Sequence, residues 1–247
     1  MKKTKPNILF GYFLKLEFLQ NLAQNFFANL SPFVSHNLEK YYVIKKALYL
    51  SSIENITGDY LEFGIYEGSS FSNAIRCYLK FNKIIDNKSS INFYGFDSFK
   101  GFGELDKKDK HPLYKDLNFE TSYKNVFQRI RKVSKNKVKF KLIEGFFSET
   151  LIKQPSYYGI KKARIIFIDS DTYVSTLAAL NFCITIIQPG TIFILDDFFS
   201  FSGSSLKGVA GAFFEFKKKN NLFFREICSY GMGGKMLILD EQVICKN

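Results

Sequence analysis

Four aspartates stand directly after two short apolar runs in the middle of the chain, at residues 165–168 and 192–195. They are Asp169 and Asp171 after the first run, and Asp196 and Asp197 after the second. Carboxylates that converge repel one another and raise each other's pKa unless a cation lies among them. A hard divalent cation prefers oxygen ligands of this kind. The aspartates therefore predict a metal site if the two runs are neighbouring strands, whereas the alternative is that Asp196 and Asp197 merely begin a loop.

The segment between the two apolar runs determines whether these carboxylates meet. It has the apolar spacing of a helix and ends at Pro189-Gly190, so residues 164–198 read as a strand, a helix and a strand. Such a crossover makes the two strands parallel neighbours, and uninterrupted apolar runs are typical of parallel strands buried on both faces. The strand ends would then lie about 5 Å apart. We expect Asp169, Asp196 and Asp197 to converge at the carboxyl edge of an α/β sheet, where ligands bind.

A second group of candidate binding residues follows an earlier predicted strand at residues 60–65. The glycine-containing turn from Gly64 to Gly68 leads through Ser69 into a helix that ends near residue 80, so backbone N–H groups and the start of the helix can approach a ligand closely. Glu62 can interact with a cationic or hydroxylated part of that ligand. The next predicted strand, 91–96, ends in Asp97, a position suited to bonding ribose hydroxyls.

The remaining segments frame these sites. An amphipathic helix is expected within residues 8–30, and it has four readings: a packing arm, a cover for the site, a contact with another subunit, or a helix on a membrane surface. The connection 99–123 is read as a substrate-side lid or as a disordered insertion. Further helices are expected at 37–50, 122–134 and 207–219, and further strands at 138–143, 222–229 and 235–239. The last two strands read as an antiparallel pair because no crossover helix separates them.

Composition limits the classes of partner. The 247 residues are 46% hydrophobic, which is enough to form the core of one large domain, or of one domain with an extension. The formal charge of +12 is compatible with nucleic acid, an anionic membrane or an acidic substrate. We expect no nucleic-acid partner, because the lysines are scattered and no basic recognition helix stands out. We also expect no stable membrane insertion, because no run of about 18 apolar residues occurs.

The cysteines and histidines argue against other site chemistries. The four cysteines are widely spaced without a CxxC pair, which favours free thiols in a reducing compartment over a zinc site. With only His36 and His111, neither a histidine metal site nor a serine–histidine triad is supported. The basic, aromatic N-terminus superficially resembles a signal peptide, but Lys15 and Glu17 interrupt its apolar stretch. We therefore expect a cytoplasmic protein.

Five motifs, one at each successive strand end, resemble those of the macrocin O-methyltransferase family, which are class I S-adenosylmethionine-dependent sugar O-methyltransferases. The resemblance covers roughly residues 40–240. The motifs are GDYLEFG at 58–64 with GSS at 68–70, YGFDSFKG at 94–101, EGFFSETL at 144–151, DSDTY at 169–173 with Ser175-Thr176, and LDDF at 195–198. Two positions depart from the usual family pattern, which commonly has a basic residue in place of Glu67 and a glycine in place of Ser170.

The resemblance implies a fold and a set of site residues. The fold is α/β, a Rossmann-like, mostly parallel seven-stranded sheet with helices on both faces and an antiparallel last strand. Residues 1–57 would form an N-terminal helical extension and residues 58–247 the methyltransferase domain. The implied cofactor-binding residues are Glu62, Gly64, Gly68, Ser69, Asp97, Ser98, Phe147, Ser148 and Asp169. The implied Mg²⁺ ligands are Asp169, Asp196 and Asp197, and the implied general base is Asp171.

The function that follows from the resemblance is methyl transfer from S-adenosylmethionine, with Mg²⁺, to a sugar hydroxyl in a glycan or glycosylated metabolite. Two alternatives are a catechol-like vicinal diol as the acceptor, and a non-catalytic cofactor-binding subunit. Retention of all four aspartates argues against the non-catalytic reading, because a binding module needs no metal cluster beside a base. The expected partners are a small-molecule or glycan acceptor and a second copy of the chain in a homo-oligomer.

Overall fold

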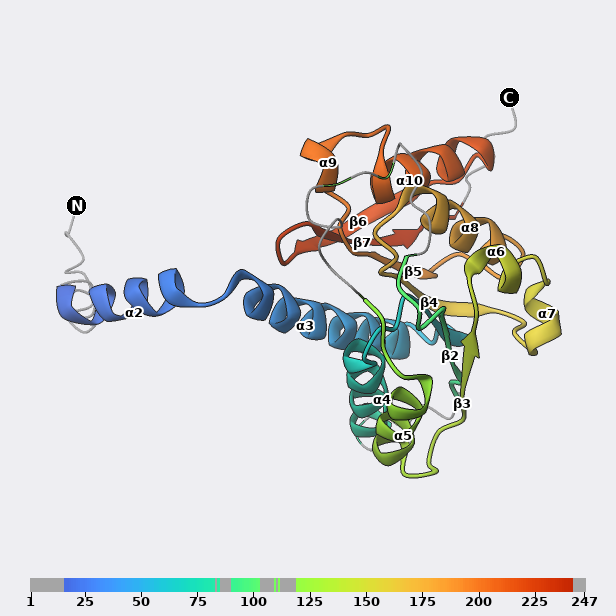
Figure 1. The fold of residues 1–247 in the computed structure, drawn as a ribbon, viewed down its shortest axis with the longest axis horizontal. Coiled ribbons are helices and arrows are strands. Elements are labelled where there is room, and N and C mark those ends of the chain that lie inside the picture. Colours follow the sequence, from blue (N-terminus) through green and yellow to red (C-terminus); the bar gives the residue numbers. More distant parts are fainter. Residues whose placement is uncertain are drawn as a thin grey trace, which may run out of the picture.

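A computed structural model describes residues 16–82, 84, 90–102, 109, 111 and 119–241 of the chain. Its centre is a seven-stranded sheet in the order β3-β2-β1-β4-β5-β7-β6, with helices packed on both faces (Figure 1). The strands are β1 (Asp59–Phe63), β2 (Phe93–Asp97), β3 (Phe140–Glu144), β4 (Ala163–Ile168), β5 (Ile192–Leu195), β6 (Phe224–Tyr230) and β7 (Gly234–Leu239). This order reverses direction between β1 and β4, which is where open α/β sheets form their ligand crevice.

Strand direction agrees with the sequence prediction. The pairs β1–β2, β1–β4, β2–β3 and β4–β5 are parallel, and β7 is antiparallel to both β5 and β6. The parallel strands β1, β4 and β5 are buried along their whole length, as their uninterrupted apolar runs predicted. The predicted fold class is therefore confirmed, including the antiparallel C-terminal pair.

Alternation along each strand divides the core into two layers. Leu61 and Phe63 of β1 pack into one layer, whereas Tyr60 of the same strand packs into the other. The first layer is covered by α6 (Phe147–Thr150), α7 (Pro155–Tyr158), α8 (Tyr173–Cys183) and α10 (Gly208–Lys219). The second is covered by α3 (Pro32–Ile53), α4 (Ser69–Phe81) and α5 (Tyr123–Ser134). The two apolar layers thus cover the two faces of the sheet, and polar candidate site residues lie at its carboxyl edge.

The N-terminal helices differ in how they meet this body. Helix α3 begins at Pro32 and buries Val43, Ile44, Ala47 and Leu48 in the second layer. Helix α2 (Glu17–Asn29) instead extends away from the body, and none of its residues is buried (Figure 1). The division of the chain into 1–57 and 58–247 stays a prediction, and α3 packs directly against the domain.

Some predicted boundaries differ from the observed ones. The helix expected within 8–30 corresponds to α2, and the part of that range before residue 16 lies outside the described residues. The helix expected at 37–50 corresponds to α3, which already begins at Pro32. Most of the connection 103–121 also lies outside the described residues, as does Cys245. A short α9 (Ser200–Gly203) follows β5. Among the described helices, none is both long and apolar enough to cross a membrane.

Candidate functional site

The carboxyl ends of β4 and β5 bring the aspartates together. Ile168 and Leu195 are paired in the parallel ladder, and Asp196 donates its backbone N–H to the Ile168 carbonyl at 2.9 Å. Asp169 donates its backbone N–H to the Phe63 carbonyl of β1 at 2.8 Å. Because both strands stop at the same level of the sheet, their following carboxylates share one edge. The sequence-based expectation that these strand ends are neighbours is confirmed.

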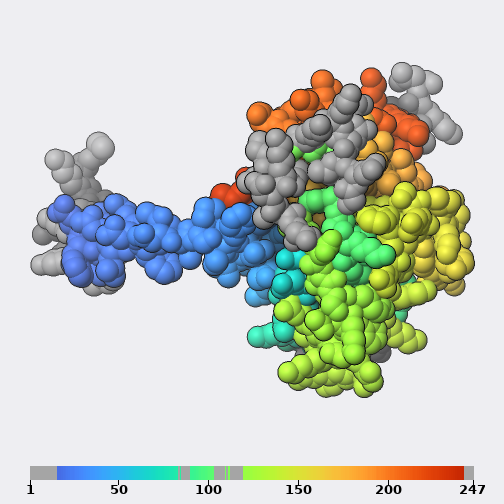
Figure 2. All heavy atoms as spheres, in the orientation of Figure 1, coloured from blue at the N-terminus to red at the C-terminus, as the bar shows by residue number. Residues whose placement is uncertain are grey.

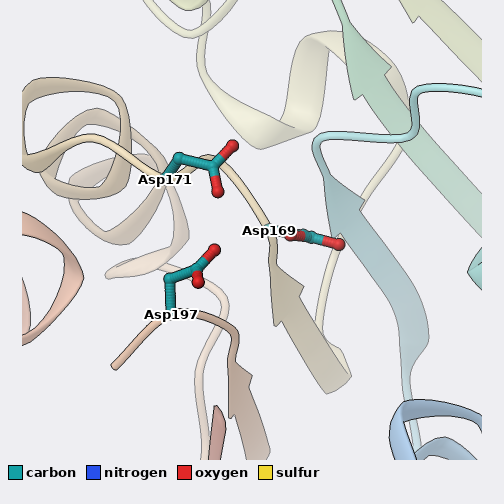
Figure 3. A group of neighbouring side chains, drawn as sticks. All are labelled: Asp169, Asp171 and Asp197. Atoms are coloured by element: carbon teal, nitrogen blue, oxygen red, sulfur yellow. The ribbon is translucent and has the colours of Figure 1, made fainter. Parts of the chain in front are cut away.

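Three of the carboxylates form a compact group. Asp169, Asp171 and Asp197 each present one oxygen, and these oxygens lie within 4.8 Å of one another. Figure 3 shows the carboxylates of Asp171 and Asp197 facing one another, with Asp169 beside them at the end of its strand. Asp171 and Asp197 have left-handed backbones, with φ of 58° and 50°. Non-glycine residues adopt this conformation at a cost that clusters at functional sites.

Crowding of these carboxylates in a buried place changes the pKa values of Asp169 and Asp171. Burial and the charge of Asp196 raise the pKa of Asp169 well above its usual range, against the lowering effect of Lys40. Burial and a hydrogen bond with Asp197 raise the pKa of Asp171 well above its usual range as well. The ionised form of this group is therefore disfavoured unless a cation compensates its charge. A divalent cation with oxygen ligands fits such a donor set.

Asp196 lies in a different environment from these three. Its Oδ2 is 2.5 Å from Lys40 Nζ and 3.1 Å from His36 Nε2, and its Oδ1 accepts from the Tyr230 hydroxyl at 2.8 Å. Burial alone would raise the pKa of Asp196, but Lys40 and His36 lower it well below its usual range. Asp196 is therefore an ionised carboxylate whose two oxygens are already bonded. The predicted ligand set of Asp169, Asp196 and Asp197 stays a prediction.

Lys40 is the functional neighbour that sequence reasoning missed. Its ammonium lies 2.8 Å from Asp169 Oδ2 as well as 2.5 Å from Asp196 Oδ2, so one protein cation bridges the ends of β4 and β5. Burial would lower the pKa of Lys40, but the two carboxylates raise it well above its usual value. A signal was present: His36 and Lys40 precede Val43 and Ala47 at the spacing of one helix face. A lysine on an apolar face indicates a buried partner.

The glycine turn after β1 lies beside the carboxylates. Gly64 has a φ of 90°, and a Cβ at this position would lie 1.8 Å from the backbone oxygen of Asp169. Only glycine allows the turn to pass so close to the end of β4. Gly68, with a φ of 76°, caps the start of α4, where Ser69 is exposed. The turn that was predicted to bind the cofactor is thereby placed against the candidate metal group.

Asp97, at the end of β2, fixes this turn from the other side. Its Oδ2 accepts backbone N–H groups from Ile65 at 2.6 Å and Tyr66 at 2.7 Å, and its Oδ1 accepts from Phe99 at 2.6 Å. The predicted ribose-binding carboxylate thus also organises the turn. Ser98 is buried and donates its hydroxyl to the Gly101 carbonyl at 2.8 Å.

Glu62 is placed deeper than the sequence suggested. It is fully buried, and its carboxylate accepts from the hydroxyls of Tyr60 and Ser70, each at 2.5 Å. Burial raises its pKa from the usual 4.5 to about 7, although both hydrogen bonds oppose the shift. In this structure Glu62 ties β1 to the first turn of α4. Its predicted contact with the cofactor is not tested by these bonds.

The residues predicted beside the adenine lie at the end of β3. Phe147 is half-buried and packs edge-on against Phe63 of β1, with ring centroids 5.9 Å apart. Ser148 is exposed on the same turn of α6. All nine predicted cofactor residues therefore lie at or just after the ends of β1 to β4, along one edge of the sheet.

The long connection after β2 reaches this edge through its described residues. Asp109 is buried, and its carboxylate accepts the backbone N–H of Tyr173 at 2.6 Å, at the first turn of α8. His111 packs against Phe201 of α9, with ring centroids 4.9 Å apart. These contacts join Asp109 and His111 to the segments that follow Asp171 and Asp197, and the interpretation of the connection as a substrate-side lid stays a prediction.

Comparison with known sequences places these features in a family. The model of the macrocin-O-methyltransferase (TylF) family matches residues 39–225. A curated relative, mycinamicin III 3''-O-methyltransferase from Micromonospora griseorubida, is 24% identical over 154 residues. This alignment covers 59% of the present chain and 57% of the relative, so the chain spans just over half of the relative's length.

Solved structures share the fold. The O-methyltransferase NovP superposes with a TM-score of 0.66 at 19% identity, covering 81% of this chain and 79% of NovP. The calicheamicin methyltransferase CalS11 superposes with a TM-score of 0.57 at 18% identity, covering 78% of this chain and 76% of CalS11. At these identities the likeness establishes the fold alone. Because the family model matches about three quarters of the sequence, the chain belongs to the macrocin O-methyltransferase family.

Proposed function

We propose that this protein transfers the methyl group of S-adenosylmethionine to a hydroxyl of a sugar in a glycan or glycosylated metabolite, and that it uses Mg²⁺. The observation that carries the proposal is the carboxylate group of Asp169, Asp171 and Asp197, placed directly against the glycine turn at Gly64. A glycine turn of this kind suits a cofactor, and a group of carboxylates suits a cation. With both bound, a methyl donor and an activated hydroxyl would meet at one edge of the sheet.

The residues at the edge fit S-adenosylmethionine. The turn from Gly64 to Gly68 approaches without side-chain obstruction, and Ser69 opens a helix whose free N–H groups attract negative charge such as the cofactor's carboxylate. We assign Asp97 and Ser98 to the ribose end, and Phe147 with Ser148 to the adenine. When bound, S-adenosylmethionine supplies the methyl group, which the acceptor oxygen takes as the sulfur leaves.

The carboxylates fit a hard divalent ion. We assign Asp169 and Asp197 as ligands, because they present close oxygens from two neighbouring strand ends. When bound, Mg²⁺ would supply positive charge that lowers the pKa of a coordinated sugar hydroxyl and holds it in place. Asp196 was predicted as a third ligand. Lys40 contacts one oxygen of Asp196 and one of Asp169, but the second oxygen of Asp196 also accepts from Tyr230, so Asp196 would bind the ion through an oxygen that already has a partner.

Asp171 is assigned as the general base. It lies within the same group, so it can receive the proton of a hydroxyl held beside Asp169 and Asp197. Its raised pKa suits proton transfer near neutral pH better than that of an exposed aspartate. Its backbone is left-handed, with a φ of 58°, and its carboxylate faces that of Asp197 (Figure 3).

The sugar acceptor is supported by the family, and the relative's name describes O-methylation of mycinamicin III at its 3'' position. Vicinal sugar hydroxyls also suit chelation by one ion. The free thiols of Cys77, Cys183 and Cys228 support a reducing, cytoplasmic setting.

The proposal is tested by methyl transfer from labelled S-adenosylmethionine to a panel of glycosides with vicinal hydroxyls, with catechols as the competing acceptor class. We expect a glycoside to be methylated in Mg²⁺ and the activity to be lost in EDTA. We expect Asp171→Asn to lose at least 100-fold in turnover while it keeps its affinity for S-adenosylhomocysteine. Activity that is indifferent to EDTA would remove the metal from the proposal, and near-normal turnover in Asp171→Asn would reject this base.

A further inference from the structure

Helix α2 is an apolar arm that the other described residues of the chain leave uncovered. Figures 1 and 2 show it standing away from the body and joined to it through α3. Phe18, Phe26 and Phe27 are 73%, 62% and 70% exposed, and the helix has no buried residue. The apolar surface is therefore continuous along the arm.

This surface continues onto the first turns of α3. Phe33 is 67% exposed, and Val34, Leu38 and Tyr42 are exposed along the same helix. Leu30 and Ser31 connect the two helices, and Pro32 starts the second. We call the exposed apolar residues of 18–42 the arm surface.

The size of the arm surface matches one side of a protein–protein interface. An aromatic side chain contributes about 150–250 Å² when it is covered, so the four phenylalanines alone present roughly 500 Å². The exposed leucines of α2 raise the apolar area to about the 800 Å² that each partner buries in a standard interface. The largest apolar patch on a typical monomer is about 300–600 Å². A lone helix of 13 residues is also marginal in water without packing.

The polar residues of the arm indicate what covers it. Helix α2 reads EFLQNLAQNFFAN, so its polar positions are neutral amides and Glu17, without lysine or arginine. Helices that lie on anionic membranes carry basic residues on their polar face. Neutral amides next to aromatic and leucine side chains suit a protein surface, where they can form hydrogen bonds at the rim.

We infer that the arm surface is the interface of a homodimer, in which α2 of each copy packs on α2 and the outer face of α3 of the other. A two-fold pairing uses the same patch on both copies, so the arm surface of one copy would pack on the arm surface of the other. Two such surfaces bury about 1,600 Å² in total, the area of a standard stable interface. This inference does not rest on the proposed methyl transfer.

The arrangement has a consequence for the site. Helix α3 carries the arm surface on its outer face and Lys40 and His36 toward Asp169 and Asp196. A partner packed on the outer face holds the helix that supplies these two contacts. The dimer thus supports the position of α3 at the carboxyl edge.

The test is sedimentation equilibrium of the full chain. We expect the wild type, at 28.6 kDa per chain, to sediment as a dimer at micromolar concentration. The double substitution Phe26→Asp with Phe27→Asp should raise the dimer dissociation constant at least 100-fold. Both side chains are exposed, so we expect the double variant to fold like the wild type, and circular dichroism measures whether it does. The control Ile152→Asp changes a side chain that is 77% exposed on the body and should sediment like the wild type.

A second readout removes any dependence on the charged variant. Leu22→Cys should form a specific disulfide between copies on mild oxidation, because α2 faces α2 across the two-fold axis. A wild-type monomer, or a dimer that survives the double substitution, overturns the inference. Co-sedimentation of the monomer with phosphatidylserine vesicles, lost on the same substitution, would assign the arm to lipid and equally overturn it.

Discussion

Replacing Lys40 with methionine removes the positive charge that bridges Asp169 and Asp196 and keeps most of the lysine's length. In the wild type the ammonium lies 2.8 Å from Asp169 and 2.5 Å from Asp196. Coulomb attraction at about 2.8 Å and an effective dielectric constant of about 20 is roughly 6 kcal/mol per pair, before the cost of burying the charges is subtracted. Removing one partner from a buried ion pair costs about 3–5 kcal/mol, because the remaining charge is left uncompensated.

We therefore expect Lys40→Met to lose about 3–5 kcal/mol of unfolding free energy in EDTA, measured by urea denaturation at pH 7. Added Mg²⁺ should restore part of this loss, because a cation held at Asp169 neutralises the same carboxylates. The control is Lys45→Met on the exposed side of the same helix, which should change stability by less than about 0.5 kcal/mol. If Lys40→Met were as stable as Lys45→Met in EDTA, Lys40 would not bridge the two strand ends and this account of the site would be wrong.

Two further substitutions test the positions around the cofactor turn. Glu62 has a folded-state pKa of about 7 against 4.5, so the stability it contributes is full below pH 4.5 and is lost as pH rises through 7. The free energy of unfolding of Glu62→Gln, measured by urea denaturation, should therefore rise by about 2.5 kcal/mol relative to that of the wild type between pH 5 and pH 8.5. If the difference between the two free energies stayed constant over this range, it would contradict the raised pKa. Gly64→Ala forces a Cβ to 1.8 Å from the Asp169 carbonyl and should lower Tm by more than about 8 °C, whereas Gly203→Ala, with a similar positive φ but open space, should lower it by about 2–4 °C. Equal losses in the two glycine variants would show that crowding at Gly64 is not the cause.

The helices, the strands and the pairing of consecutive strands could be predicted from the sequence. Apolar runs and the crossover between them placed Asp169 and Asp196 on adjacent strand ends, because chain connectivity alone makes such strands parallel neighbours. Most strand ends differ from the predicted ones by one or two residues, because the last bonded pair depends on neighbours such as Asp97, whose carboxylate binds the following turns, whereas both ends of β5 were predicted as observed.

Long-range partners could not be read from the pattern. Lys40 is 129 residues from Asp169 in the chain, and its role depends on how α3 crosses the ends of β4 and β5. The division of the aspartates was also hidden, because it depends on the left-handed backbones of Asp171 and Asp197. Those conformations turn Asp171 into the group with Asp169, while Asp196 faces Lys40 and Tyr230. Nothing in residue types or spacing indicates such a rotation.

Binding of Mg²⁺ to the carboxylate group is measured by calorimetric titration of Mg²⁺ into the protein saturated with S-adenosylhomocysteine. We expect one ion per chain, with affinity reduced at least 10-fold in Asp197→Asn and unchanged in Glu149→Gln, which alters an exposed carboxylate at the same edge. Binding of Mg²⁺ that is equally strong in Asp197→Asn, or no binding to the wild type, would contradict the claim that this carboxylate group is a metal site.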